Sequence, residues 1–97
     1  MTRSLTPRQR KLLKAKAHAL EPVVQLGQAG LSDTVVAEID RSLTAHGLIK
    51  VRIGDADRDA REALTGEICA RTGAAAVQSV GRILVLWRPR EDADIDA

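Results

Sequence analysis

The amino-acid sequence predicts an α/β fold of the α+β kind, in which one domain of 97 residues has three helices and a four-stranded mixed sheet. Apolar residues at helical spacing alternate along the chain with short apolar segments that are typical of strands. Glycines follow two of the expected helices, and the last part of the chain has the pattern of a hairpin. The expected order is αβαβαββ, and strands joined through a helix should be parallel with a right-handed crossover.

The first expected helix begins with a capping signal. Thr6 is suited to the N-cap, Pro7 to the first helical position, and Gln9 completes a capping box. The helix should run to about His18, because the residue before Pro22 disfavours helical geometry. Its narrow apolar stripe consists of Leu13, Ala17 and Leu20, with Leu12 beside it.

A strand at residues 23–26 leads into a loop with two glycines and then into a second helix. Ser32 can cap this helix, which should span residues 33–45 and end before Gly47. Its apolar positions are Val35, Val36, Ile39 and Leu43. The next strand, residues 48–53, alternates, so that Ile49, Val51 and Ile53 share one face and Lys50 and Arg52 the other.

The rest of the chain is expected to form a helix and a hairpin. Either Asp55 or Asp57 can cap the third helix, which should end at Gly73 with Ala60, Leu64 and Ile68 on one face. The hairpin pairs residues 75–80 with residues 83–88, and its second strand is apolar on both faces, which favours a central position. The domain core should span about residues 5–89, and the acidic tail, residues 90–97, is expected to be disordered.

The composition argues against several classes of protein. The single cysteine, Cys69, excludes an internal disulfide framework, and two distant histidines do not make a zinc site. The N-terminus has no apolar signal core, and residues 83–87 are too short to span a bilayer. We therefore expect a cytoplasmic protein with no metal, no cofactor, no small-molecule substrate and no membrane partner. No Cys, His or acidic set is placed for catalysis, so an enzyme is not expected.

The net charge of +2 conceals a strong asymmetry. Residues 1–20 contain six Lys or Arg and no acidic residue, whereas the remainder carries nine basic and all 13 acidic residues. A basic end on an otherwise acidic chain indicates a polyanionic partner. The candidate phosphate contacts that avoid the apolar stripe are Arg8, Arg10, Lys11 and Lys14. Lys50 and Arg52 either extend this surface or face water, and for Arg82 and Arg88 the second interpretation is favoured.

The loop Gly27, Gln28, Ala29 and Gly30 forms a G-x-x-G motif between a strand and a helix. A loop without bulky side chains beside a helix N-terminus presents free N–H groups that suit a phosphate. A tight strand-to-helix turn with a glycine at each bend explains the same pattern. The motif alone favours the structural interpretation.

Five segments together resemble the CRM domain, a family named for chloroplast RNA splicing and ribosome maturation, in its bacterial stand-alone YhbY-type form. They are residues 5–9 (LTPRQ), 22–31 (PVVQLGQAGL), 48–51 (LIKV), 72–73 (TG) and 80–89 (VGR through LVLWRP). The resemblance implies a fold similar to the C-terminal domain of translation initiation factor three. It also implies RNA binding, with large-subunit rRNA or a pre-ribosomal particle as partner.

The resemblance places the family's loop motif on Gly27, Gln28, Ala29 and Gly30. Members of the family often have a basic or hydroxyl residue where this chain has Gln28, so any charge at the loop must come from elsewhere. Trp87 stands where the family usually has tyrosine, and we expect it to pack over the sheet edge. As Trp87 is the single aromatic residue, recognition should depend on phosphates and shape rather than on base stacking.

The sequence therefore predicts a non-catalytic RNA-binding protein of ribosome assembly. The alternative is a protein-interaction adaptor whose basic helix binds an acidic surface of a partner. Salt-sensitive affinity for a folded rRNA fragment would distinguish the first from the second.

Overall fold

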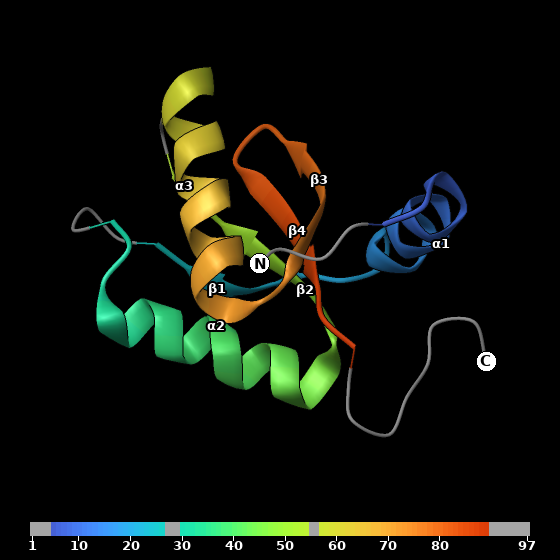
Figure 1. The fold of residues 1–97 in the computed structure, drawn as a ribbon, viewed down its shortest axis with the longest axis horizontal. Helices are drawn as coiled ribbons and strands as arrows, with labels where there is room; N and C mark the ends of the chain where they lie inside the picture. The colour runs from blue at the N-terminus through green and yellow to red at the C-terminus, as the bar shows by residue number, and fades with distance from the viewer. Residues whose placement is uncertain (1–4, 27–29, 55–56, 90–97) are drawn as a thin grey trace.

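The computed structural model describes residues 5–26, 30–54 and 57–89, and these form the seven elements in the predicted order (Figure 1). The elements are α1 (Pro7–Ala17), β1 (Pro22–Gln25), α2 (Asp33–His46), β2 (Leu48–Arg52), α3 (Arg58–Thr72), β3 (Ala75–Val80) and β4 (Ile83–Trp87). The predicted fold class, with three helices and a mixed sheet of four strands, is confirmed.

The strand order in the sheet is β1-β2-β4-β3. β1 and β2 are parallel, as expected for strands joined through a helix, and β4 is antiparallel to both β2 and β3. The apolar character of β4 on both faces correctly predicted its place between two other strands.

The helices lie on opposite faces of the sheet, with α2 and α3 on one face and α1 on the other (Figure 1). The larger core joins Ile39 and Leu43 of α2 and Ile68 of α3 to the buried face of β2 and β4. The smaller core consists of Leu13, Ala17, Val77 and Val85, with Leu5, Leu48, Ile83 and Trp87 packed against it. Trp87 thus lies on a strand flanked by two others and under α1, rather than over an edge of the sheet.

The helix caps follow the local sequence signals. The Thr6 hydroxyl accepts a hydrogen bond from the Gln9 N–H, and the Gln9 side chain accepts one from the Thr6 N–H. Ser32 caps α2, and Asp57, one of the two candidates, caps α3. Such bonds satisfy N–H groups that the first turn of a helix leaves without partners.

Two residues expected on apolar stripes are exposed. Leu20 is 37% exposed because α1 ends at Ala17, with His18 as C-cap, so helical periodicity no longer governs Leu20. Ala60 is exposed because it lies in the first turns of α3, at the end that projects beyond the sheet in Figure 1. The buried residues of α3, which are Ile68, Cys69 and Thr72, all lie in its C-terminal half.

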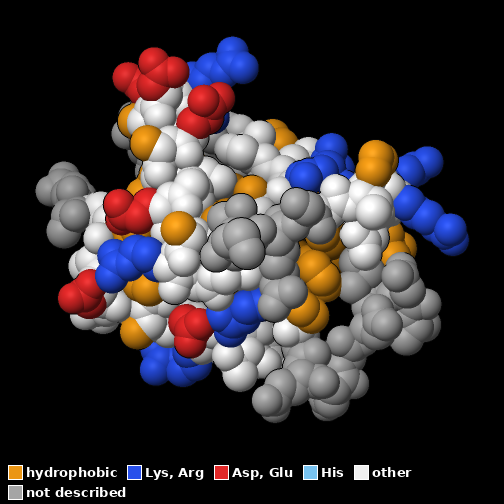
Figure 2. Space-filling model, viewed as in Figure 1, with side chains coloured by type: hydrophobic (Ala, Val, Ile, Leu, Met, Phe, Trp, Pro, Cys, Tyr) orange, Lys and Arg blue, Asp and Glu red, His pale blue; other side chains and the backbone are white. Residues whose placement is uncertain are grey.

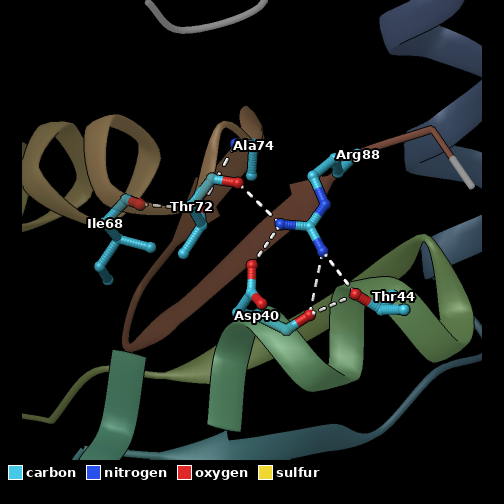
Figure 3. Close-up of polar contacts among 6 residues, drawn as sticks. All are labelled: Asp40, Thr44, Ile68, Thr72, Ala74 and Arg88. Carbon is cyan, nitrogen blue, oxygen red and sulfur yellow. Dashed lines mark hydrogen bonds and ion pairs between the residues drawn. The ribbon is translucent and has the colours of Figure 1, made fainter. Parts of the chain in front are cut away.

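Arg88 connects three elements, contrary to the expectation that it faces water (Figure 3). Its side chain is 17% exposed, and Nη1 donates to Asp40 Oδ1 at 2.6 Å and to the Thr72 carbonyl at 2.7 Å. Nη2 donates to the Asp40 carbonyl and to Thr44 Oγ1. The guanidinium, which has five donors in a fixed plane, thereby joins the end of β4 to α2 and to the C-terminus of α3.

Candidate nucleic-acid interface

The face of the sheet that carries α1 is only partly covered by that helix. Strand register places Lys50 and Gln78 on either side of Val85, and Arg52 and Val80 on either side of Ile83. Val85 is buried under α1, whereas Arg52 and Val80 are exposed. We call the uncovered part, formed by Lys50, Arg52, Gln78, Val80 and Ile83, the open sheet face.

A groove of about 290 Å³ separates the C-terminal half of α1 from the open sheet face. Lys14 and His18 line it from the helix, and Lys50 and Gln78 line it from the sheet. Its apolar lining consists of Ala17, Val80, Ile83 and Val85. The α1 groove therefore brings together two predicted phosphate contacts, Lys14 and Lys50, that are far apart in sequence, and none of the described residues that line it is acidic.

The exposed cations of α1 continue away from this groove. Arg8, Lys11 and Lys14 follow one another at three-residue intervals and are exposed, so they form a row along the helix. Figure 2 shows Lys and Arg side chains over α1 with no acidic side chain among them, whereas Asp and Glu gather over α2 and α3. Within the part of the chain that the structure describes, no salt bridge involves Arg8, Lys11, Lys14, Lys50 or Arg52.

Arg10 differs from the other predicted contacts because the fold itself uses it. Its Nη1 donates to the carbonyl oxygens of Ala76 at 2.8 Å and Val77 at 2.7 Å. A register shift between Ala76 and Gln78 leaves Val77 without a partner residue on β4. Arg10 therefore stabilises a bulge in the edge strand β3, where a neighbouring strand is missing.

Arg52 connects the open sheet face with the start of the G-x-x-G loop. The Leu26 N–H donates to the Arg52 carbonyl at 2.9 Å, and Gln25 pairs with Arg52 across β1 and β2. A second groove, of about 530 Å³, follows β1 and is lined by Arg52, Val23 and Gln25 among others. Arg52 thus lies beside Leu26, the residue that directly precedes the loop motif.

Three of the four loop residues, Gly27, Gln28 and Ala29, lie outside the described residues. Gly30 is described and has φ +74°, which favours glycine, and an added Cβ would meet no atom within 4 Å. The need for glycine at position 30 is therefore conformational in this structure rather than steric.

The described residues give little support for a metal site, a nucleophilic cysteine or a membrane-spanning helix. No group of three His, Cys, Asp or Glu residues in residues 5–26, 30–54 and 57–89 is arranged to hold a metal ion. Burial raises the pKa of the Cys69 thiol, which disfavours the nucleophilic thiolate. Within those same ranges, no helix has the length and apolar character required to cross a membrane.

The fold and this face define a class of protein, a small α+β domain whose cations on one helix and one sheet have no ion-pair partner among the described residues. The chain belongs to the CRS1/YhbY (CRM) domain family, whose model matches residues 5–88. This confirms the resemblance seen in the sequence.

Individual relatives cover nearly the same length. A Haemophilus influenzae protein named RNA-binding protein is 47% identical over 92 residues, which cover 95% of this chain and 93% of the relative. A Pseudomonas aeruginosa protein named probable RNA-binding protein is 41% identical over 88% of this chain and 82% of its own. The solution structure of a Staphylococcus aureus protein, described as a candidate RNA-binding protein, matches with a TM-score of 0.79 and 28% identity. That match covers 94% of this chain and 93% of the other.

Sequence reasoning missed two residues of the α1 groove. His18 was expected only as the approximate end of the first helix, where it is the C-cap, but it also lines the groove. No pattern in the sequence marks Gln78 as a residue of this groove, because its place there depends on the pairing of β3 and β2 with β4, which puts Lys50 in the same row.

Proposed function

We propose that this chain is a non-catalytic RNA-binding protein that binds rRNA of the precursor large ribosomal subunit during assembly in the cytoplasm. One observation carries the proposal: cations of α1 and of β2 lie on the same face of the molecule, and they have no ion-pair partners among the described residues. The names of the relatives support RNA as the polyanion. The finer partner, the pre-ribosomal rRNA, rests on the resemblance to the family.

The binding mode follows from the arrangement of charge. Lys14 and Lys50 face each other across the α1 groove, and Lys11 and Arg8 extend the row along the helix. Lysine ammonium groups that neutralise phosphates release condensed counterions, so affinity falls as salt rises. Arg52 and the G-x-x-G loop would hold a further phosphate at the neighbouring end of the sheet.

The test compares two pairs of cations on opposite faces of the molecule. Lys14→Gln with Lys50→Gln keeps polar side chains at both sites but removes two charges from the α1 groove. For a single-stranded rRNA fragment, the log–log salt slope should shrink by about 1.4. The control is Arg41→Gln with Arg58→Gln, which removes two exposed charges from α2 and α3. Equal slopes for the two double variants would contradict the proposal.

The cellular partner requires a separate experiment. In a cell extract, the chain should sediment with particles lighter than the mature large subunit and should leave them as salt rises. Association that survives ribonuclease would instead favour the adaptor, whose basic helix binds an acidic protein surface.

A further inference from the structure

We propose that His18 is a further phosphate contact in the α1 groove, and that it makes the affinity for RNA depend on pH. This inference rests on the proposed RNA-binding function and adds a contact that is charged only when protonated. The charge pattern of the sequence did not implicate His18, because a histidine is counted as neutral at pH 7.

The end of α1 places His18 in the groove. His18 is the C-cap of this helix and lies four residues after Lys14, and both side chains line the groove. Residues four apart lie on the same face of a helix. Lys50 of β2 lines the same groove from the sheet. A histidine and a lysine of α1 therefore share this groove with a lysine of β2.

The imidazole of His18 has no partner within the described part of the fold. His18 is exposed, and no described residue makes a hydrogen bond or an ion pair with its ring. The neutral ring has one donor and one acceptor, whereas the protonated ring has two donors and a positive charge. Hydrogen bonds from a charged donor to a phosphate are about twice as strong as those between neutral groups. The protonated ring is therefore the form that a phosphate binds.

The groups that share the groove with His18 do not neutralise a charge on its ring. Among the described residues that line the groove, Lys14 and Lys50 are the other titratable ones, and none is acidic. The side chains from β3 and β4 do not titrate, and they are Gln78, Val80, Ile83 and Val85. Glu21, the nearest acidic residue in sequence, lines the groove along β1 instead. A protonated His18 therefore adds a third positive charge beside two lysines, an arrangement that suits a polyanion.

The titration of imidazole gives this contact a measurable signature. Imidazole ordinarily changes its charge between about pH 5 and pH 8, a range in which lysine and arginine side chains stay charged. Each further phosphate that is neutralised on a single strand increases the log–log salt slope by about 0.7. The slope should therefore be steeper at low pH than at high pH.

His46, the other histidine of the chain, offers a matched control. It is also exposed and ends a helix, α2, but this helix covers the opposite face of the sheet (Figure 1). An imidazolium at either helix end complements the helix dipole, so a purely structural effect of protonation should be alike at both. His18→Gln and His46→Gln are the same chemical change at these two places. His18→Lys instead gives the groove a permanent charge.

The experiment measures the salt dependence of binding to a single-stranded rRNA fragment by the full chain at about pH 5.5 and about pH 8. For the wild-type chain and His46→Gln, the slope should be steeper by about 0.7 at the lower pH. His18→Gln should have the shallower slope at both pH values, and His18→Lys the steeper slope at both. Thermal unfolding at each pH verifies that every variant remains folded.

The outcomes separate this inference from the proposed function. A salt slope of the wild-type chain that is equal at the two pH values would overturn the role of His18 and leave RNA binding intact. A pH-dependent slope that persists in His18→Gln, or that is lost in His46→Gln as well, would also overturn it. Absence of salt-dependent RNA binding by the wild-type chain would refute both.

Discussion

Arg10 Nη1 lies 2.7 Å from the carbonyl oxygen of Val77, so one cation of the basic helix is a structural residue of the sheet edge. The same nitrogen also donates to the preceding carbonyl, that of Ala76. Lys11, the next residue along α1, is exposed and forms no such bond. The cations of α1 therefore divide into one that stabilises the fold and others that bond to no side chain or carbonyl among the described residues.

The first prediction concerns this division. Arg10→Ala should lower the free energy of unfolding by about 1–2 kcal/mol, because two carbonyls at the bulge lose a charged donor. Lys11→Ala should change it by less than about 0.5 kcal/mol, as is usual for an exposed site. Urea denaturation of both variants measures the difference. Equal effects would show that the Arg10 hydrogen bonds contribute nothing to stability.

The second prediction concerns Arg88. Arg88→Ala should destabilise the domain by roughly 2 kcal/mol or more, because it removes donors from two backbone carbonyls and from Asp40. Arg71 provides the comparison, since its partner Asp33 is 96% exposed and a surface pair contributes at most about 1 kcal/mol. Arg71→Ala should therefore have the smaller effect in denaturant unfolding, and the reverse order would contradict the structural role of Arg88.

The third prediction separates the two interpretations of the G-x-x-G loop. Gln28→Lys adds a cation at the position where the family often has one, so it should tighten RNA binding several-fold at low salt. The melting temperature should hardly change. Gln28→Glu should weaken binding by repulsion at the same place. If neither variant alters the affinity, the loop is a structural turn and the cations of α1 and β2 carry the interaction.

Gly30→Ala is the companion variant for stability. Its φ of +74° predicts a cost on the order of 1 kcal/mol from the backbone alone, since the added methyl group has open space. A cost near zero in denaturant unfolding would show that the loop relaxes to another conformation.

The fourth prediction concerns pH. Burial raises the pKa of the Cys69 thiol, so the folded state retains a proton that the unfolded chain releases at lower pH. The contribution of Cys69 to stability is present below the unfolded pKa of about 8.5 and is lost as pH rises above it. Cys69→Ala should therefore show a smaller loss of stability than the wild type between neutral pH and pH 10. Identical pH dependence would contradict this assignment.

Local sequence signals were sufficient to predict the helices and strands of this fold. The capping box from Thr6 to Gln9 spans four residues, and the alternation of Ile49, Lys50 and Val51 belongs to a single strand. Such signals depend on backbone geometry that neighbouring residues define among themselves, so they can be read without the tertiary structure. The connection through a helix predicted that the first two strands are parallel, and the apolar faces of the last strand predicted its central position, and the structure confirms both.

Tertiary structure decided which polar side chains belong to the fold and which remain free. Arg10 and Arg88 looked like surface cations, but their partners lie 66 or more residues away for Arg10 and 16 to 48 residues away for Arg88. Lys50 and Gln78 likewise line the same groove only because β4 pairs with both of their strands. Strand register arises from packing of the whole core, and no local pattern at either residue specifies it.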